Sequence, residues 1–291
     1  MKNKVLVTGG TGNTGGHVIE NLLSQGIPVR ALVRKIDERS DALAARGVEI
    51  VEGDLTDLDA VTAALKDIKS AFFVYTIKEA GILDATAYFA QAAYETGVEA
   101  IVNLSQFGAN RHVKSHGAQN HWIAERLFDR APVPVTHLRP TLFAEWFMYQ
   151  AMVIRSESKY YLPFGDAKFA PIATEDIARV AAAILADPAP HAGKSYDLFG
   201  PKILSMAEIA EIFTSVLERP VTYVPIDTET FIGILKKFLN AGPYFIQHVT
   251  SLGQDLADGR EAGMNDLVEQ LTGQKPLQMA DYILKNKAAF A

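Results

Sequence analysis

Short runs of β-branched and apolar residues alternate with longer stretches of helical spacing through the first half of the chain. The apolar runs lie at residues 5–8, 28–33, 48–51, 71–75, 100–104 and 133–138. Between them, apolar positions recur on one helical face at residues 14–25, 58–65, 82–96 and 118–129. Strands that alternate with helices form parallel βαβ units, in which helices cover both faces of the sheet. The pattern therefore predicts an α/β fold with a doubly wound parallel sheet.

The second half of the chain is less regular and is predicted to be mostly helical. A helix should begin at Thr174, whose hydroxyl is placed to cap it ahead of two acidic residues. Ser205 and Glu208 have the spacing of a capping box that opens another helix. Residues 221–224 predict a short strand, and helical spacing dominates from Phe231 onward.

Two regions follow from this change of pattern. We expect residues 1–155 to form the sheet domain and residues 156–291 to form a smaller, helical, substrate-binding region. A helix at 174–187 should pack back on the first region. The second region should wall a cleft at the carboxyl edge of the sheet.

Composition narrows the class of protein. The 291 residues carry a net charge of −6 and no cysteine. An acidic surface argues against nucleic-acid and anionic-membrane partners, and the lack of thiols excludes disulfides and thiolate metal sites. No metal site is expected. No run approaches the ~18 apolar residues of a membrane helix, and no signal-peptide core follows the first residues. We therefore expect a cytoplasmic protein, as a monomer or homodimer.

Glycines recur at every third position after the first predicted strand, at Gly9, Gly12 and Gly15. Glycine permits a tight turn and a close approach of the backbone to a pyrophosphate, which the free N–H groups of the next helix then face. The segment follows a strand and opens an amphipathic helix, which is the context of a Rossmann dinucleotide-binding loop. A glycine-rich turn without a ligand is the alternative. The predicted cofactor-binding residues of this loop are Gly9, Thr11, Gly12, Asn13, Thr14 and Gly15.

The second strand ends in Arg34 and Lys35, where NAD-specific proteins carry an acidic residue. A guanidinium there can hold the 2′-phosphate of NADP through paired, charge-assisted hydrogen bonds. We therefore prefer NADP(H) as cofactor, with NAD(H) possible because Asp37 and Glu38 follow. Asp54, in the segment 53–57 after the third strand, is a candidate to accept from the adenine amine. A helix N-cap is the alternative role for this segment. Further expected cofactor contacts are Leu55, Tyr75 and Pro140.

These segments resemble the short-chain dehydrogenase/reductase superfamily, and more narrowly its atypical NmrA-like branch. The resemblance rests on residues 8–15, 29–34 and 53–57 and continues through 104–105, 121–125, 138–141, the helix from 174, and 267–290. It implies an NAD(P)H-dependent reductase of quinones, azo compounds or triphenylmethane dyes. It also leaves open a non-catalytic regulator that senses NADP(H).

The catalytic pattern of the wider superfamily is missing. Those enzymes use a Ser and a Tyr-x-x-x-Lys pair, but no tyrosine of this chain has a lysine at the fourth position after it. By the resemblance, His121 and Glu125 occupy the matching positions and Ser105 keeps the place of the serine. Residues spaced i,i+4 share a helical face, so Glu125 should favour a protonated His121 that acts as an acid. A surface pair without a chemical role is the alternative.

Without a Tyr–Lys pair, the chemistry favours acceptors whose product anion is delocalised. A quinone, azo, imine or conjugated-alkene acceptor needs positioning against the nicotinamide more than it needs a strong acid. We predict a small aromatic or conjugated substrate in a pocket of aromatic side chains, or else these side chains belong to the core. The candidate pocket residues are Phe107, Phe143, Trp146, Phe147 and Tyr149.

Overall fold

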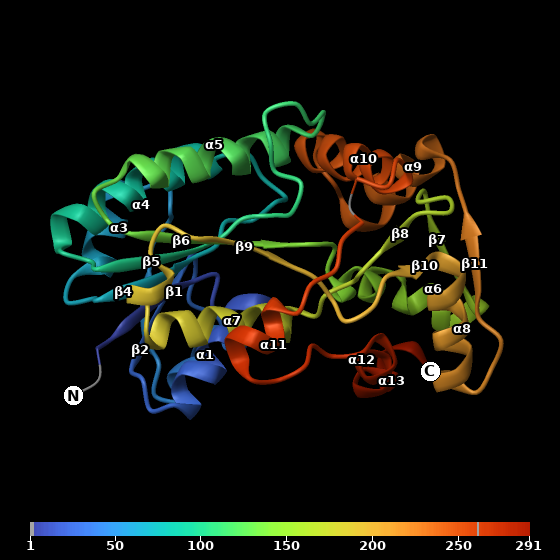
Figure 1. The fold of residues 1–291 in the computed structure, drawn as a ribbon, viewed down its shortest axis with the longest axis horizontal. Helices are drawn as coiled ribbons and strands as arrows, with labels where there is room; N and C mark the ends of the chain where they lie inside the picture. Colours follow the sequence, from blue (N-terminus) through green and yellow to red (C-terminus); the bar gives the residue numbers. More distant parts are fainter. Residues whose placement is uncertain (1–2, 261) are drawn as a thin grey trace.

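The computed structural model describes residues 3–260 and 262–291 of the chain. A seven-stranded parallel sheet has the order β3-β2-β1-β4-β5-β6-β9 (Figure 1). Its strands are β1 (Val5–Thr8), β2 (Val29–Val33), β3 (Glu49–Glu52), β4 (Ser70–Phe73), β5 (Ala100–Leu104), β6 (Val135–Pro140) and β9 (Ser195–Leu198). The first six follow the strand order of a Rossmann fold. The predicted fold class is therefore confirmed.

The seventh strand, β9, was not predicted. It lies at the edge of the sheet beside β6, and its sequence Ser-Tyr-Asp-Leu is only partly buried. An edge strand with one neighbour needs no continuous apolar run, so its pattern is weak. With β9, the chain after residue 155 returns to the sheet.

Helices cover both faces of the sheet (Figure 1). On one face lie α3 (Leu58–Leu65), α4 (Ile82–Thr96) and α5 (His116–Arg130). On the other lie α1 (Asn13–Ser24), α7 (Thr174–Ala186) and α11 (Leu267–Thr272), and α2 (Glu38–Ala44) lies beside β3. The central strands are buried on both sides, which explains why their sequences are almost continuously apolar.

The cap of α7 differs from the prediction. The cap residue is Ala173, and the Thr174 hydroxyl does not cap the helix. Instead, the Glu145 carboxylate accepts from the Thr174 backbone N–H at 3.1 Å and from its hydroxyl at 2.8 Å. A carboxylate from elsewhere in the chain thus accepts from the free backbone N–H at the start of α7. The local sequence cannot reveal such a partner.

The rest of the second half forms a smaller lobe beside the sheet domain (Figure 1). Its elements are the 3-10 turn η1 (Ala144–Gln150), α6 (Ala151–Glu157), β7 (Lys159–Leu162), β8 (Lys168–Phe169), β10 (Leu204–Ser205), α8 (Met206–Leu217), β11 (Thr222–Pro225), α9 (Thr228–Leu239), α10 (Pro243–Ala257), α12 (Met279–Lys285) and α13 (Lys287–Phe290). A further 3-10 turn, η2 (Ala189–His191), precedes β9. The predicted capping box of Ser205 and Glu208 opens α8.

Helix α10 packs on α5, so this lobe closes over the carboxyl edge of the sheet. Among the described residues, no helix combines the length and the apolar character needed to cross a bilayer.

Candidate active site

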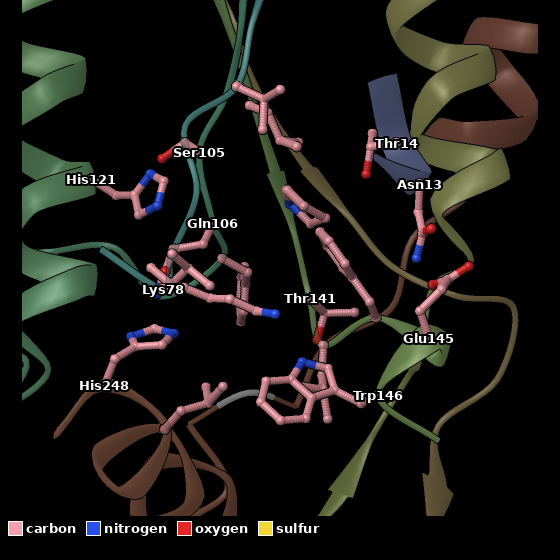
Figure 2. A pocket seen from close by; sticks show the side chains of 18 of the residues that line it. Asn13, Thr14, Lys78, Ser105, Gln106, His121, Thr141, Glu145, Trp146 and His248 are labelled. Carbon is pink, nitrogen blue, oxygen red and sulfur yellow. The ribbon is translucent and has the colours of Figure 1, made fainter. Parts of the chain in front are cut away.

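The carboxyl ends of the central strands open into a cavity of about 420 Å³ (Figure 2). Its walls come from the start of α1, the loops after β4, β5 and β6, η1, α5 and α10. Ligands of doubly wound sheets bind at this edge. Predicted residues that line the cavity are Asn13, Thr14, Tyr75, Ser105, Phe107, His121, Pro140, Phe143, Trp146 and Tyr149.

The glycine loop forms a closed turn against the start of α1. Gly9 has a φ of +62°, and its carbonyl oxygen accepts from the Gly12 N–H at 2.9 Å. A Cβ on Gly15 would overlap with that same Gly9 carbonyl oxygen. Helix α1 begins without a side-chain cap and without an acidic residue in its first turn. Its first N–H groups therefore have no carboxylate competing for them, and the loop fits an anion at this end of the helix.

Arg34 lies at the end of β2 and is already engaged in an ion pair. Its Nη1 is 2.9 Å from Glu79 Oε2, and both side chains are largely exposed. Lys35 is exposed beside it. Asp37, an alternative ribose ligand, instead caps α2 in a capping box with Ser40. One of the two acidic residues that left NAD possible is thus bonded to backbone N–H groups of α2.

Asp54 lies in the turn after β3. Its carboxylate accepts from the Thr56 backbone N–H at 2.8 Å and from the Thr56 hydroxyl at 2.7 Å, and these bonds hold the pKa of Asp54 below its usual range. The cap of α3 is Asp57, which accepts from the Ala60 N–H at 3.1 Å. The helix N-cap that the sequence offered for residues 53–57 is therefore Asp57 and not Asp54. Its contact with adenine stays a prediction.

His121 and Glu125 share one face of α5, and that face is buried. The two residues are 7% and 0% exposed, so the surface-pair alternative is wrong. Burial lowers the pKa of His121 to about 4 and outweighs the opposing effect of Glu125. The expectation that His121 is protonated at neutral pH is therefore wrong. Its neutral ring lines the cavity together with Ser105 (Figure 2).

Glu125 has a partner that the sequence did not reveal. Arg139, at the end of β6, donates to it through Nε at 2.8 Å and Nη2 at 2.5 Å. Burial by itself would raise the pKa of Glu125, but the bonds from Arg139 hold it below its usual range. Glu125 does not line the cavity. Glu125 still raises the pKa of His121, as predicted, but burial of the imidazole has the larger effect.

A sequence model of the NmrA-like family matches residues 1–281. The chain belongs to the NmrA-like family. It is 29% identical to an NAD(P)H azoreductase of Xenophilus azovorans, over 98% of this chain and 99% of that protein. It is 26% identical to quinone oxidoreductase 2 of Escherichia coli, over 80% of this chain and 81% of that protein. It also has the fold of the negative transcriptional regulator NmrA solved in complex with NAD, with a TM-score of 0.81 and 16% identity over 98% of this chain and 95% of that one.

One wall of the cavity in this NmrA-like protein is aromatic. The Trp146 ring is stacked on Phe245 of α10, with centroids 6.2 Å apart and planes 10° apart, and Tyr149 lies 5.4 Å from Trp146. Phe107 packs edge-on against Phe199, 4.8 Å away. These aromatic rings give the cavity apolar surfaces on which a planar ligand can stack.

Phe147 is a correction to the predicted pocket. It is 1% exposed and packs against Tyr160 and Phe213 in the core of the smaller lobe. In a 3-10 turn, residues three apart share a face. Trp146 and Tyr149 therefore face the cavity together, while Phe147 points away from it.

Several cavity residues were missed by the sequence analysis. Phe245, His248 and Leu252 have helical spacing on α10, a pattern equally typical of a core helix. Figure 2 shows Lys78 extending into the cavity, and its ammonium lies 5.9 Å from the centroid of Tyr149. Nothing in the local sequence marks Lys78. Within residues 3–260 and 262–291, no group of His, Asp and Glu side chains is arranged to hold a metal ion.

Proposed function

We propose that this NmrA-like protein is an NAD(P)H-dependent reductase of small, planar, conjugated acceptors. The observation that supports this most is the shared cavity: Asn13 and Thr14 of the glycine loop line the same space as the aromatic wall of Trp146 and Tyr149. A dinucleotide held by the loop would present its nicotinamide to a flat ligand stacked on that wall.

The residues present fit a dinucleotide. Position 15 lies so close to the Gly9 backbone that only glycine fits there. The first turn of α1 offers N–H groups to a diphosphate. Arg34 directly follows β2, where a guanidinium would pair with a 2′-phosphate, and this supports NADP(H) as the preferred cofactor with NAD(H) as a second ligand. When bound, the reduced nicotinamide supplies a hydride.

The chain's own part is to bind and orient the acceptor and to exclude water. Trp146 and Tyr149 offer planar surfaces, and the neutral His121 offers a hydrogen bond without a charge. An acceptor that delocalises the incoming charge does not need a strong general acid. The azoreductase and quinone reductase relatives act on such compounds by their names, which supports the same class for this chain.

The fold by itself does not separate an enzyme from a regulator, because a regulator shares it. The deciding experiment mixes the protein with NADPH and a panel of quinones and azo dyes and follows the absorbance of the reduced cofactor. We expect turnover above background with at least one acceptor class. Micromolar binding of NADPH without turnover of any acceptor would reject the reductase and favour a non-catalytic sensor.

Replacing Arg34 by alanine tests the cofactor preference. Hydrogen bonds to a charged group contribute about 1.5–3 kcal/mol, so the affinity for NADPH should fall by about 10- to 150-fold. The affinity for NADH, which lacks the 2′-phosphate, should change by less than about threefold. Isothermal titration with both cofactors measures this. Equal losses for the two would contradict the assignment of Arg34.

Glu79→Gln is the matched control, because the Glu79 carboxylate accepts a hydrogen bond from the Arg34 guanidinium in the absence of cofactor. The ion pair is exposed, so its removal should strengthen NADPH binding by no more than about fivefold. NADH binding should stay unchanged.

A further inference from the structure

Helix α10 brings a second histidine into the cavity. His248 is 5% exposed and lies on the same wall as His121, across the cavity from Trp146 (Figure 2). The two histidines come from different lobes, His121 from α5 and His248 from α10. Neither the fold nor the glycine loop requires a histidine at this place.

The hydrogen bonds of Ser115 define which ring nitrogen of His248 carries the proton. The Ser115 hydroxyl oxygen lies 2.7 Å from His248 Nδ1 and accepts the Ala118 N–H at 3.0 Å as the cap of α5. Among the described residues, the hydroxyl hydrogen has no other acceptor, so it donates to Nδ1. The proton of the neutral ring is then on Nε2. Nε2 makes no hydrogen bond within the described part of the chain and is not fully enclosed by it.

The helix contact holds this ring in place. A Cβ on Gly117 would lie 2.7 Å from His248 Nδ1, so the glycine allows α5 and α10 to approach at the imidazole. Burial, together with the nearby His121, lowers the pKa of His248 to about 4. The ring is therefore a fixed, neutral N–H donor at pH 7. Such a donor suits an oxygen that begins as a neutral carbonyl and gains charge during the reaction.

We propose that His248 Nε2–H binds a carbonyl oxygen of the acceptor, and that the favoured substrates are conjugated carbonyl compounds. This proposal rests on the proposed function and adds the substrate class to it. On reduction, the acceptor gains the hydride with its electron pair, and the nicotinamide is oxidised. The resulting negative charge moves to the oxygen that His248 holds, and a proton from water then neutralises it. His248 keeps its own proton throughout.

The test compares two acceptors in His248→Leu and His248→Gln. One acceptor is menadione, a quinone with two carbonyl oxygens, and the other is a triphenylmethane dye without a carbonyl group. Loss of a donor to a developing oxyanion costs about 100-fold in rate, so His248→Leu should lower kcat/KM for menadione by about that factor. Reduction of the dye should fall by less than about threefold. Glutamine retains an N–H donor and should recover part of the menadione activity.

The control is Tyr244→Phe, one turn earlier on α10. Its hydroxyl accepts from Asn120 at the same α5–α10 contact but does not line the cavity. We expect both acceptors to be reduced at the rates of the unmodified protein, with unchanged NADPH affinity in all three variants.

The outcomes separate the two proposals. Equal losses for both acceptors, or no loss for menadione, would overturn the role of His248. If the unmodified protein binds NADPH but reduces neither acceptor, the reductase proposal fails, and binding of menadione followed by tryptophan fluorescence still tests His248. Menadione affinity that is the same in His248→Leu and in the unmodified protein would then reject the carbonyl site.

Discussion

Replacing Gly15 by alanine should weaken binding of NADPH and NADH alike, by about 10- to 100-fold. The new Cβ would overlap with the Gly9 carbonyl oxygen and lie 3.0 Å from the Gly10 backbone nitrogen. These are backbone atoms, so no side-chain rotation relieves the overlap. The turn must open, which breaks the Gly12 to Gly9 hydrogen bond and moves the N–H groups away from the diphosphate. Isothermal titration measures the loss, and circular dichroism checks that the sheet domain is folded.

Gly16→Ala is the matched control, one residue along the same helix. Its Cβ would lie 3.5 Å from the Gly10 carbonyl oxygen, which is an ordinary contact. Alanine within a helix is favoured over glycine, so this variant should gain about 0.5–1 kcal/mol in stability while it keeps its cofactor affinity. Cofactor affinity that survives in Gly15→Ala would contradict the loop as the diphosphate site.

Replacing Arg139 by methionine should lower the free energy of unfolding by about 3 kcal/mol, at the lower end of the range for breaking a buried ion pair. The change leaves Glu125, which is 0% exposed, without its bidentate partner. The lower end applies because Arg126 Nη2 lies 3.4 Å from Glu125 and can take up part of the charge. Urea unfolding at pH 7, followed by circular dichroism, measures the difference.

The double variant Glu125→Leu with Arg139→Met separates stability from chemistry. Removing both charges replaces the pair by apolar side chains, which is often neutral or stabilising. We expect stability within about 1 kcal/mol of the unmodified protein and retained reduction of menadione, because Glu125 does not line the cavity. A double variant that is stable but inactive would show that the Glu125–Arg139 pair is needed for catalysis.

Much of the fold could be predicted from local patterns. The strands β1 and β5 and the helices α3 and α4 have the predicted bounds, because strands buried on both faces and amphipathic helices each have a spacing that is visible along the chain. The elements that were missed are short or lie at an edge, such as β9 and β8, where few residues carry the signal. The glycine loop was found because its spacing and its place between strand and helix are both local.

The candidate site was only partly predictable, for an electrostatic reason. The spacing of His121 and Glu125 correctly placed them on one helical face, but a charge state depends on burial and on all charges nearby. Burial makes His121 neutral, and Arg139 from a different strand takes the Glu125 carboxylate. Neither effect can be obtained from spacing along one helix.

The sequence by itself determined six strands of the sheet, the glycine loop and the family, since each depends on short local segments of the chain. Only the tertiary structure decided which side chains share the cavity and in which charge state. Helix α10 places His248 beside α5 through contacts between positions 133 residues apart. Such contacts arise from the packing of two lobes, so no periodicity along the chain predicts them.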